Sequence, residues 1–185
     1  MRVKRSECAL LVIDVQDRLI DTIVEHAAVM QNIRALIKAS EVLTVSVLVT
    51  KQEKLGEIAP ELVALISKSP SLKLSFSCCG DSEFMTRLKA NQKRALIVVG
   101  IETHICVLQT VLDLLKLRYR VLIARDATSS HTLIDRDSAI ERMRNSGAII
   151  TTTEAIIYEL TEKAGTEEFR EILEIVKERR NAFSS

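Results

Sequence analysis

Short runs of apolar residues recur along the chain, and stretches with helical spacing lie between them. The runs are rich in Val, Ile and Leu, which is typical of strands buried on both faces of a parallel sheet. They cover residues 9–13, 45–49, 95–99, 121–124 and 148–150. Residues 27–43 and 103–117 instead place apolar side chains on neighbouring helical turns.

Two further helices are indicated by their end signals. Asp81 can cap a helix that carries Phe84 and Leu88, and Asp135 can open one that stops at Gly147. Strands that alternate with helices form right-handed βαβ units. The pattern therefore predicts an α/β fold, a three-layer α/β/α sandwich around a doubly wound, mainly parallel sheet.

A single domain over residues 1–185 is expected. The sequence contains two prolines, no Gly/Ser-rich linker and no internal repeat. Residues 166–180 place Phe169, Ile172, Leu173 and Val176 at helical spacing. We expect a C-terminal helix there, packed on the domain or on a neighbouring subunit.

Composition and charge narrow the range of partners. The chain has 185 residues, 47% apolar and 28% charged, with a formal net charge of +1, no Trp, two Tyr and four Phe. Mixed charge and few aromatic rings argue against nucleic acid as a partner and give no reason for membrane attachment.

The apolar run before Asp14 is too short for a signal sequence, so cytoplasmic localisation is the simplest expectation. The short basic start, MRVKRSE, leaves a mitochondrial location open.

The four cysteines are expected to be reduced thiols. Cys8, Cys78, Cys79 and Cys106 form neither a CxxC repeat nor the dense pattern of a secreted disulfide scaffold. The adjacent pair Cys78 and Cys79 is open to two interpretations: redox chemistry in an exposed loop, or packing and pocket wall. The second is favoured.

In an open parallel sheet the functional crevice lies at the carboxyl ends of the strands, and three polar features are interpreted as lying at that edge. They are Asp14, Lys73 in the segment LKLSF, and Cys106 in GIETHIC. Cys106 falls near the first turn of a helix, where partial positive charge lowers a thiol pKa, so it can be a reactive thiolate; the alternative is a small core residue. Asp14 is either a proton-transfer group or a helix cap. Lys73 points into the crevice or merely solvates a surface.

At these positions the sequence resembles the isochorismatase-like superfamily of cysteine hydrolases, which includes nicotinamidases and N-carbamoylsarcosine amidases. The motifs ALLVIDVQ, KLSFS and VVGIETHICVLQT occur in family order and spacing over nearly the whole chain. The amino-acid sequence from GIETHICVLQT onward is most similar to the metal-independent branch of YcaC-like hydrolases and isochorismatase-domain proteins.

The resemblance implies a catalytic triad of Asp14, Lys73 and Cys106, with a cis peptide between Ile101 and Glu102. It further implies an oxyanion hole formed by the backbone N–H groups of Glu102 and Cys106. Cys106 would attack a carbonyl carbon, and a thioester would form and be hydrolysed by water. The expected function is cysteine-dependent hydrolysis of a nonpeptide C–N bond, of amide or carbamoyl type, in a small-molecule substrate.

Two departures from better-known members refine this expectation. Isochorismatases proper lack the nucleophilic cysteine, so Cys106 argues against vinyl-ether hydrolysis. Nicotinamidases carry an Asp-x-His metal motif after the second strand, where this chain has VTKQEKLGEIAPEL. We therefore expect no metal and no cofactor, and nicotinamide is a poor substrate candidate.

The remaining expectations concern the pocket and the assembly. The substrate-pocket candidates are Gln16, Phe76, His104 and His131. A direct dyad of His104 with Cys106 is disfavoured because residues two apart at a helix start point in different directions. Family members generally associate, so a homo-oligomer is expected. The competing hypothesis is a binding or nucleic-acid-associated protein, ribonuclease-like, that keeps the hydrolase fold.

Overall fold

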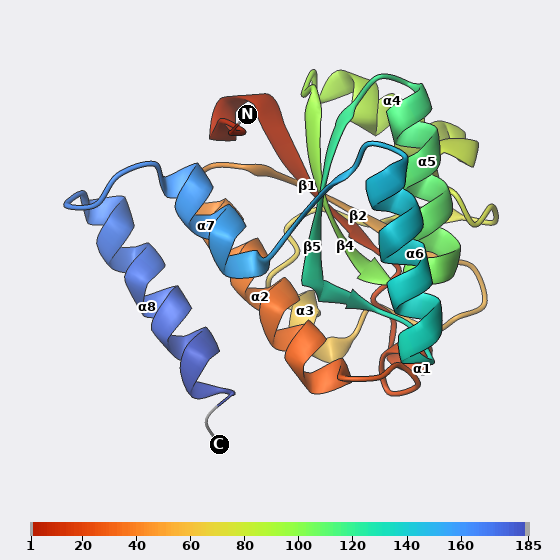
Figure 1. The fold of residues 1–185 in the computed structure, drawn as a ribbon, viewed down its shortest axis with the longest axis horizontal. Coiled ribbons are helices and arrows are strands. Elements are labelled where there is room, and N and C mark those ends of the chain that lie inside the picture. Colours follow the sequence, from red (N-terminus) through yellow and green to blue (C-terminus); the bar gives the residue numbers. More distant parts are fainter. Residues whose placement is uncertain (1, 184–185) are drawn as a thin grey trace.

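Among residues 2–183, which the computed structural model describes, six strands form one fully parallel sheet (Figure 1). Of the predicted domain over residues 1–185, Met1, Ser184 and Ser185 lie outside this described part. The strands are β1 (Cys8–Ile13), β2 (Ser46–Gln52), β3 (Ser71–Lys73), β4 (Ala95–Ile101), β5 (Arg120–Ser129) and β6 (Ile149–Thr151). Their order is β3-β2-β1-β4-β5-β6, so the chain winds outward in both directions from the centre.

Helices cover both faces of the sheet (Figure 1). One face carries α2 (His26–Val42), α7 (Thr153–Thr161) and α8 (Glu167–Asn181), and the other carries α4 (Ser82–Ala90), α5 (Leu108–Lys116) and α6 (Leu133–Asn145). Two short helices, α1 (Asp17–Ile20) and α3 (Pro60–Val63), lie in the connections next to β1 and β2. The predicted three-layer α/β/α sandwich with a doubly wound parallel sheet is confirmed.

Strand β1 shows why the apolar runs become central strands. All six of its residues are buried. Successive side chains point to opposite faces, so Leu10 and Val12 pack in the cluster with α2 and α7. Ala9, Leu11 and Ile13 pack in the cluster with α4, α5 and α6. A strand covered on both sides needs apolar side chains at every position, which is the continuous run seen in the sequence.

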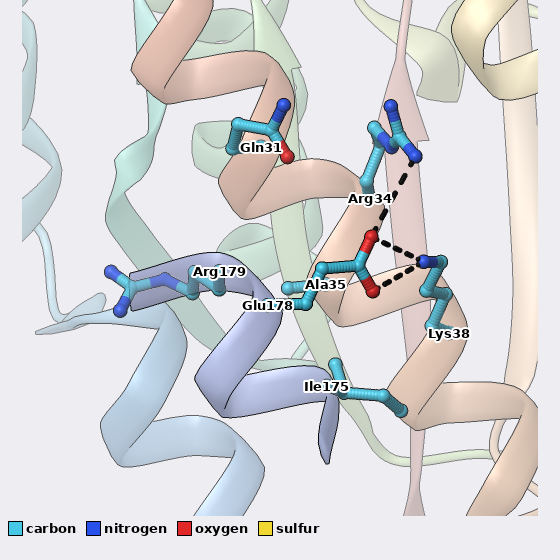
Figure 2. Close-up of a pocket in the computed structure, with 7 residues that line it drawn as sticks. All are labelled: Gln31, Arg34, Ala35, Lys38, Ile175, Glu178 and Arg179. Atoms are coloured by element: carbon cyan, nitrogen blue, oxygen red, sulfur yellow. Dashed lines mark hydrogen bonds and ion pairs between the residues drawn. The ribbon is translucent and has the colours of Figure 1, made fainter. Parts of the chain in front are cut away.

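The C-terminal helix α8 packs on α2 of the same chain. It spans Glu167–Asn181, close to the predicted 166–180, and the Thr166 side chain caps it by accepting a hydrogen bond from Phe169 N at 3.1 Å. Its apolar face buries Ile172 and Val176. Figure 2 shows Glu178 of α8 reaching toward Arg34 and Lys38 of α2. Among residues 2–183, no helix is both long and apolar enough to cross a membrane.

Two details of the sequence prediction need correction. Helix α6 does not open at Asp135: its N-cap is Thr132, whose hydroxyl accepts a hydrogen bond from Asp135 N at 3.2 Å. It ends where predicted, just before Gly147, which has a φ of +106°. Strand β3 was not predicted, because it has only three residues and no continuous apolar run. Its pairing with β2, in which Gln52 lies beside Lys73, is what makes it a strand.

Candidate active site

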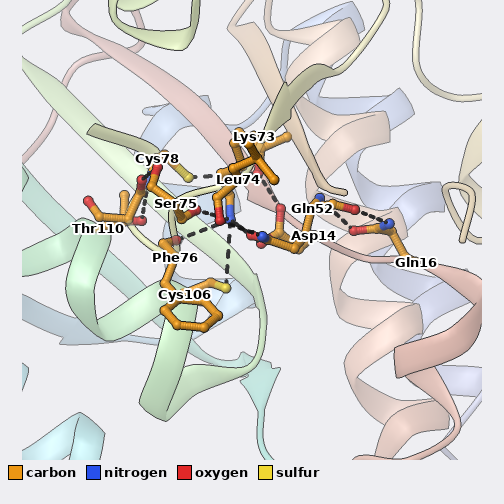
Figure 3. Close-up of polar contacts among 12 residues, drawn as sticks. Asp14, Gln16, Gln52, Lys73, Leu74, Ser75, Phe76, Cys78, Cys106 and Thr110 are labelled. Atoms are coloured by element: carbon orange, nitrogen blue, oxygen red, sulfur yellow. Dashed lines mark hydrogen bonds and ion pairs between the residues drawn. The ribbon is translucent and has the colours of Figure 1, made fainter. Parts of the chain in front are cut away.

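The side chains of Asp14, Lys73 and Cys106 meet at the carboxyl edge of the sheet (Figure 3). Asp14 follows β1, Lys73 is the last residue of β3, and Cys106 lies in the turn after β4. Lys73 Nζ is 2.6 Å from Asp14 Oδ2 and 3.7 Å from Cys106 Sγ. Three segments distant in sequence thus bring an anion, a cation and a thiol to one point.

Asp14 is held in place by its backbone and by a threonine. It has a φ of +51°, in the left-handed region that aspartate tolerates better than most residues, and it turns the chain out of β1. Its side chain is fully buried, and Oδ1 accepts a hydrogen bond from Thr50 Oγ1 at 2.8 Å. The alternative interpretation of Asp14 as a helix cap is wrong, because the N-cap of α1 is Gln16.

Lys73 is a buried cation whose ammonium group is surrounded by acceptors. The residue is 1% exposed. Besides Asp14, Nζ donates to Gln52 Oε1 at 2.6 Å and to the carbonyl oxygens of Ser75 and Phe76 at 3.2 and 3.1 Å. The alternative interpretation of Lys73 as a surface-solvating residue is therefore wrong.

Cys106 reaches the site because β4 ends close against β1. A Cβ atom at Gly100 would lie 2.1 Å from the carbonyl oxygen of Ile13, so this position accepts only glycine, which also adopts the observed φ of +119°. The Ile101–Glu102 peptide is cis. The chain then enters η3 (Thr103–Val107), a π-helical turn, before α5, and Cys106 sits in that turn with 7% exposure. Such turns often occur at functional sites.

The protonation of Cys106 differs from the sequence expectation. Burial and the Asp14 carboxylate raise the pKa of the Cys106 thiol to about 12, and Lys73 offsets only part of this. This raised pKa is opposite in direction to the lowering expected from the start of a helix, and it favours a neutral thiol in the resting site. For Lys73, burial alone would lower the pKa, but Asp14 and Cys106 raise it above its usual value. The resting site is an ion pair beside a thiol.

The four pocket candidates lie in different surroundings. Gln16 is fully buried, and its amide bonds to the backbone of Gln52 and Gly56. Phe76 is exposed, and its carbonyl contacts Lys73.

The two histidines are tied to neighbouring loops. His104 Nδ1 lies 2.9 Å from Ser130 Oγ. His131 Nδ1 lies 2.9 Å from the carbonyl oxygen of Thr22, and its backbone N–H donates to the Glu102 carboxylate. No hydrogen bond in the described part of the chain links either histidine to Asp14, Lys73 or Cys106, and their place in the pocket stays a prediction.

Sequence reasoning missed two residues of the site. Gln52 accepts a hydrogen bond from Lys73, and Thr50 donates to Asp14. Both stand at the end of a strand, so the rule that singled out Asp14 could have found them. Cys78 is also close by: its backbone N–H donates to Thr110 Oγ1 at 2.9 Å, and its thiol contacts Thr50 Oγ1 at 3.7 Å. It is fully buried, as expected of a packing residue.

No group of three or more His, Cys, Asp or Glu side chains within residues 2–183 is placed to hold a metal ion.

Comparison with known proteins identifies the family of this fold and site. The isochorismatase domain model matches residues 8–155. Isochorismatase family protein 1B of Dictyostelium discoideum is 36% identical over 94% of this chain and 87% of its own length. The chain belongs to the isochorismatase domain family. The resemblance inferred from the sequence motifs is thereby confirmed, and membership implies hydrolase activity.

Two solved structures have the same fold. The MAR1 ribonuclease of Caenorhabditis elegans superposes with a TM-score of 0.89 at 32% identity, covering 96% of this chain and 93% of the other. The YcaC protein of Escherichia coli, described as an octameric hydrolase of unknown specificity, superposes with a TM-score of 0.90 at 23% identity, covering 100% and 95%. At that level of identity the YcaC likeness supports the fold alone.

Proposed function

We propose that this isochorismatase-family protein hydrolyses a nonpeptide C–N bond, of amide or carbamoyl type, in a small molecule, with Cys106 as nucleophile. The observation that carries the proposal is the buried cluster in which Lys73 Nζ lies 2.6 Å from Asp14 Oδ2 and 3.7 Å from Cys106 Sγ. A thiol beside a carboxylate and an ammonium group is suited to attack on a carbonyl carbon. No cofactor is needed for this reaction.

The first half of the reaction forms a thioester. As Cys106 Sγ attacks the carbonyl carbon, the thiol proton passes to the Asp14 carboxylate and an S–C bond forms. The carbonyl oxygen becomes an oxyanion, which the backbone N–H groups of Glu102 and Cys106 stabilise. The oxyanion then collapses, the C–N bond breaks, and Asp14 returns its proton to the departing nitrogen. An amine or ammonia leaves.

The second half releases the acid. Water attacks the thioester carbon and gives a proton to Asp14, and the C–S bond breaks. The sulfur leaves as a thiolate and takes that proton back, which restores the thiol. Lys73 keeps its proton in this scheme: burial opposes its charge, but Asp14 and Cys106 raise its pKa. Its charge stabilises the thiolate whenever the sulfur is negative.

Because Cys106 rests as a neutral thiol, Asp14 acts as a general base in this scheme. A thiol pKa of about 12 leaves almost no free thiolate near neutral pH. Proton transfer to Asp14 during the attack removes the need for a preformed thiolate. Reactivity then depends on a substrate that reaches the sulfur, which limits unwanted oxidation of Cys106 between turnovers.

The test is hydrolysis of a panel of small primary amides and carbamoyl compounds, measured by ammonia release and by intact-protein mass spectrometry for the acyl adduct. Cys106→Ala and Asp14→Asn should abolish ammonia release. Cys8→Ala, which removes a thiol at the start of β1, the end opposite Asp14, is the matched control and should keep full activity. Ammonia release that survives Cys106→Ala would overturn the proposal.

The competing function is ribonuclease-like, and it draws on the name of the C. elegans relative. The same preparations should therefore be incubated with RNA over a range of salt concentrations, since nucleic-acid binding weakens steeply with salt. RNA cleavage by both the wild type and Cys106→Ala, without amide hydrolysis, would favour that alternative. We further propose that the chain forms a homo-oligomer, as the E. coli YcaC protein is described to do.

A further inference from the structure

The carboxyl end of β2 is paired by a side chain where its neighbouring strand has already ended. The last β1–β2 pair is Ile13 with Thr50. Two residues farther along β2, the Gln16 side chain takes over: its Oε1 accepts from Gln52 N at 2.8 Å, and its Nε2 donates to Gln52 O at 3.0 Å. A second bond from Nε2 reaches Gly56 O at 2.9 Å. The Gln16 amide thus imitates one more residue of β1.

The side chain of Gln52, whose backbone is held by Gln16, forms a hydrogen bond with Lys73. Its Nε2 donates to the carbonyl oxygen of Leu74 at 2.8 Å, and its Oε1 accepts from Lys73 Nζ at 2.6 Å. The two bonds fix the orientation of the amide, because a flipped amide would turn its N–H groups toward the ammonium group and its oxygen toward a carbonyl. Figure 3 shows the side chains of Gln16, Gln52 and Lys73 as successive neighbours in space, beside Asp14.

The position of the Lys73 ammonium group is not fixed by its own strand. Lys73 ends a strand of three residues at the edge of the sheet, and its side chain is long and flexible. The Asp14 carboxylate, at 2.6 Å, attracts the ammonium group more strongly than the neutral thiol at 3.7 Å does. Gln52 Oε1, at 2.6 Å on another strand, is the shortest of the three uncharged oxygen contacts of Nζ, ahead of the Ser75 and Phe76 carbonyls, and it favours a position of Nζ that also faces Sγ.

We propose that Gln16 and Gln52 are positioning residues for the reaction, in which Gln16 fixes the backbone of Gln52 and Gln52 Oε1 holds the Lys73 ammonium group facing Cys106. This inference rests on the proposed function, since it assumes that Lys73 stabilises negative charge on Cys106. It also gives Gln16 a role different from the substrate contact expected from sequence.

The test compares Gln52→Met, Gln16→Met and the double variant, in which amides are replaced by apolar side chains of similar length. Alkylation of Cys106 by neutral iodoacetamide and by anionic iodoacetate is followed at one pH by peptide mass spectrometry. Gln52→Met should slow iodoacetamide alkylation about tenfold, the size expected for a hydrogen bond to a charged group. The iodoacetate-to-iodoacetamide rate ratio should fall too, because the cation no longer faces the sulfur.

A purely structural role would give a different result. If Gln16 acts through Gln52, the double variant should be no slower than Gln52→Met alone. Asn32→Leu is the matched control: Asn32 is another buried amide, bonded to the Asp126 carbonyl at 2.6 Å, so its loss should lower the melting temperature and leave both alkylation rates unchanged.

The possible failures are distinguishable. If wild-type Cys106 reacts no faster than the fully buried Cys8 and Cys78, the proposed function loses its nucleophile. If wild-type Cys106 reacts faster than they do but folded Gln52→Met keeps the wild-type rates and ratio, only the positioning role is overturned. Additive effects on the alkylation rate in the double variant would contradict the inference that Gln16 acts through Gln52.

Discussion

The protonation of Cys106 shows how single residues set the chemistry of this site. The start of a helix favours a thiolate, but that effect is worth only about 1 kcal/mol at an exposed terminus. Burial and a neighbouring carboxylate act in the opposite direction and dominate, so the pKa rises to about 12. In the proposed mechanism the base, Asp14, is therefore separate from the nucleophile, Cys106, and the proton moves only when the sulfur attacks.

Replacing Asp14 should separate alkylation from catalysis. In Asp14→Asn the negative charge that raises the Cys106 pKa is gone and Lys73 remains, so the pKa should fall and alkylation should begin at lower pH. Amide hydrolysis should nevertheless be lost, because the base is missing. Lys73→Met should shift the alkylation profile to higher pH. The measurement is the pH dependence of Cys106 alkylation by peptide mass spectrometry, and identical profiles in all three proteins would contradict the coupling.

Gly100 should tolerate no side chain. In Gly100→Ala the new Cβ would lie 2.1 Å from Ile13 O, between two central strands. We expect a loss of about 3 kcal/mol or more in the free energy of unfolding, or no folding at all. Gly147→Ala is the matched control, because Gly147 also has a positive φ, +106°, but no atom lies within 4 Å of the position that a Cβ would occupy. It should cost only about 1–2 kcal/mol by urea denaturation.

At this scale the sequence predicted residue types better than their partners. Asp14, Lys73 and Cys106 could be singled out because each stands near a strand end or in a family motif. Gln52 and Thr50 occupy equivalent positions, but a neutral polar side chain at a strand end has many possible uses. Only the three-dimensional distances reveal that one contacts Lys73 and the other Asp14.

Among the elements, the apolar strands, including the three-residue β6, and the long helices were predictable, whereas β3 was not. Runs such as residues 9–13 and 95–99 predict strands by themselves, because a strand buried on both faces has apolar side chains at every position. Strand β3 has alternating exposure at Ser71, Leu72 and Lys73 and exists through its pairing with β2. The segment 103–117 was predicted as one helix, yet it begins as the π-helical turn that contains Cys106, a distinction that side-chain periodicity does not encode.

Docking of α8 should depend on Arg179 more than on Glu178. Arg179 has a side chain only 12% exposed and bonds to Asp126, Glu154 and Asn32. Arg179→Met removes these bonds, although Glu154 keeps its pair with Arg180, and should lower the free energy of unfolding by about 2 kcal/mol. Glu178 is 55% exposed in its pair with Lys38, so Glu178→Gln should cost less than about 1 kcal/mol. Urea denaturation of both variants decides, and equal losses would contradict this ranking.

Acid should weaken the same contact. Hydrogen bonds from Lys38 hold the pKa of Glu178 below its ordinary value of 4.5, and Arg180 does the same for Glu154. A carboxylate with a lowered folded-state pKa stabilises the protein above its unfolded pKa, and this contribution is lost as the pH falls through the folded pKa. Protection of the α8 backbone amides against hydrogen exchange, corrected for the intrinsic exchange rate at each pH, should therefore be lower below pH 4.5 than at neutral pH. The protection of the β1 amides should change less.

For the whole molecule, exposed apolar side chains mark a surface for the proposed association of copies. The terminal helix was expected to pack on the domain or on a neighbouring subunit, and it packs on the domain, where Ile172 and Val176 of α8 are buried. Large exposed apolar side chains instead gather in sequence around Lys73: Leu72 is 46%, Leu74 70% and Phe76 54% exposed. Because the carbonyls of Ser75 and Phe76 contact the Lys73 ammonium group, a subunit packed on this segment would lie next to the candidate active site.

If copies associate through this segment, a charge there should separate them. Leu74→Glu and Phe76→Glu place a carboxylate in an interface that must be desolvated, which costs several kcal/mol without a partner. Light scattering should then give a lower mass than for the wild type, whereas Leu117→Glu, at an exposed position that follows α5, should keep the wild-type mass. A wild-type monomer, or an assembly unchanged by both charges, would contradict this interface. Loss of amide hydrolysis in a dissociated but folded Leu74→Glu would mean that the site depends on its neighbour, because Leu74 contributes to it only the carbonyl that accepts from Gln52.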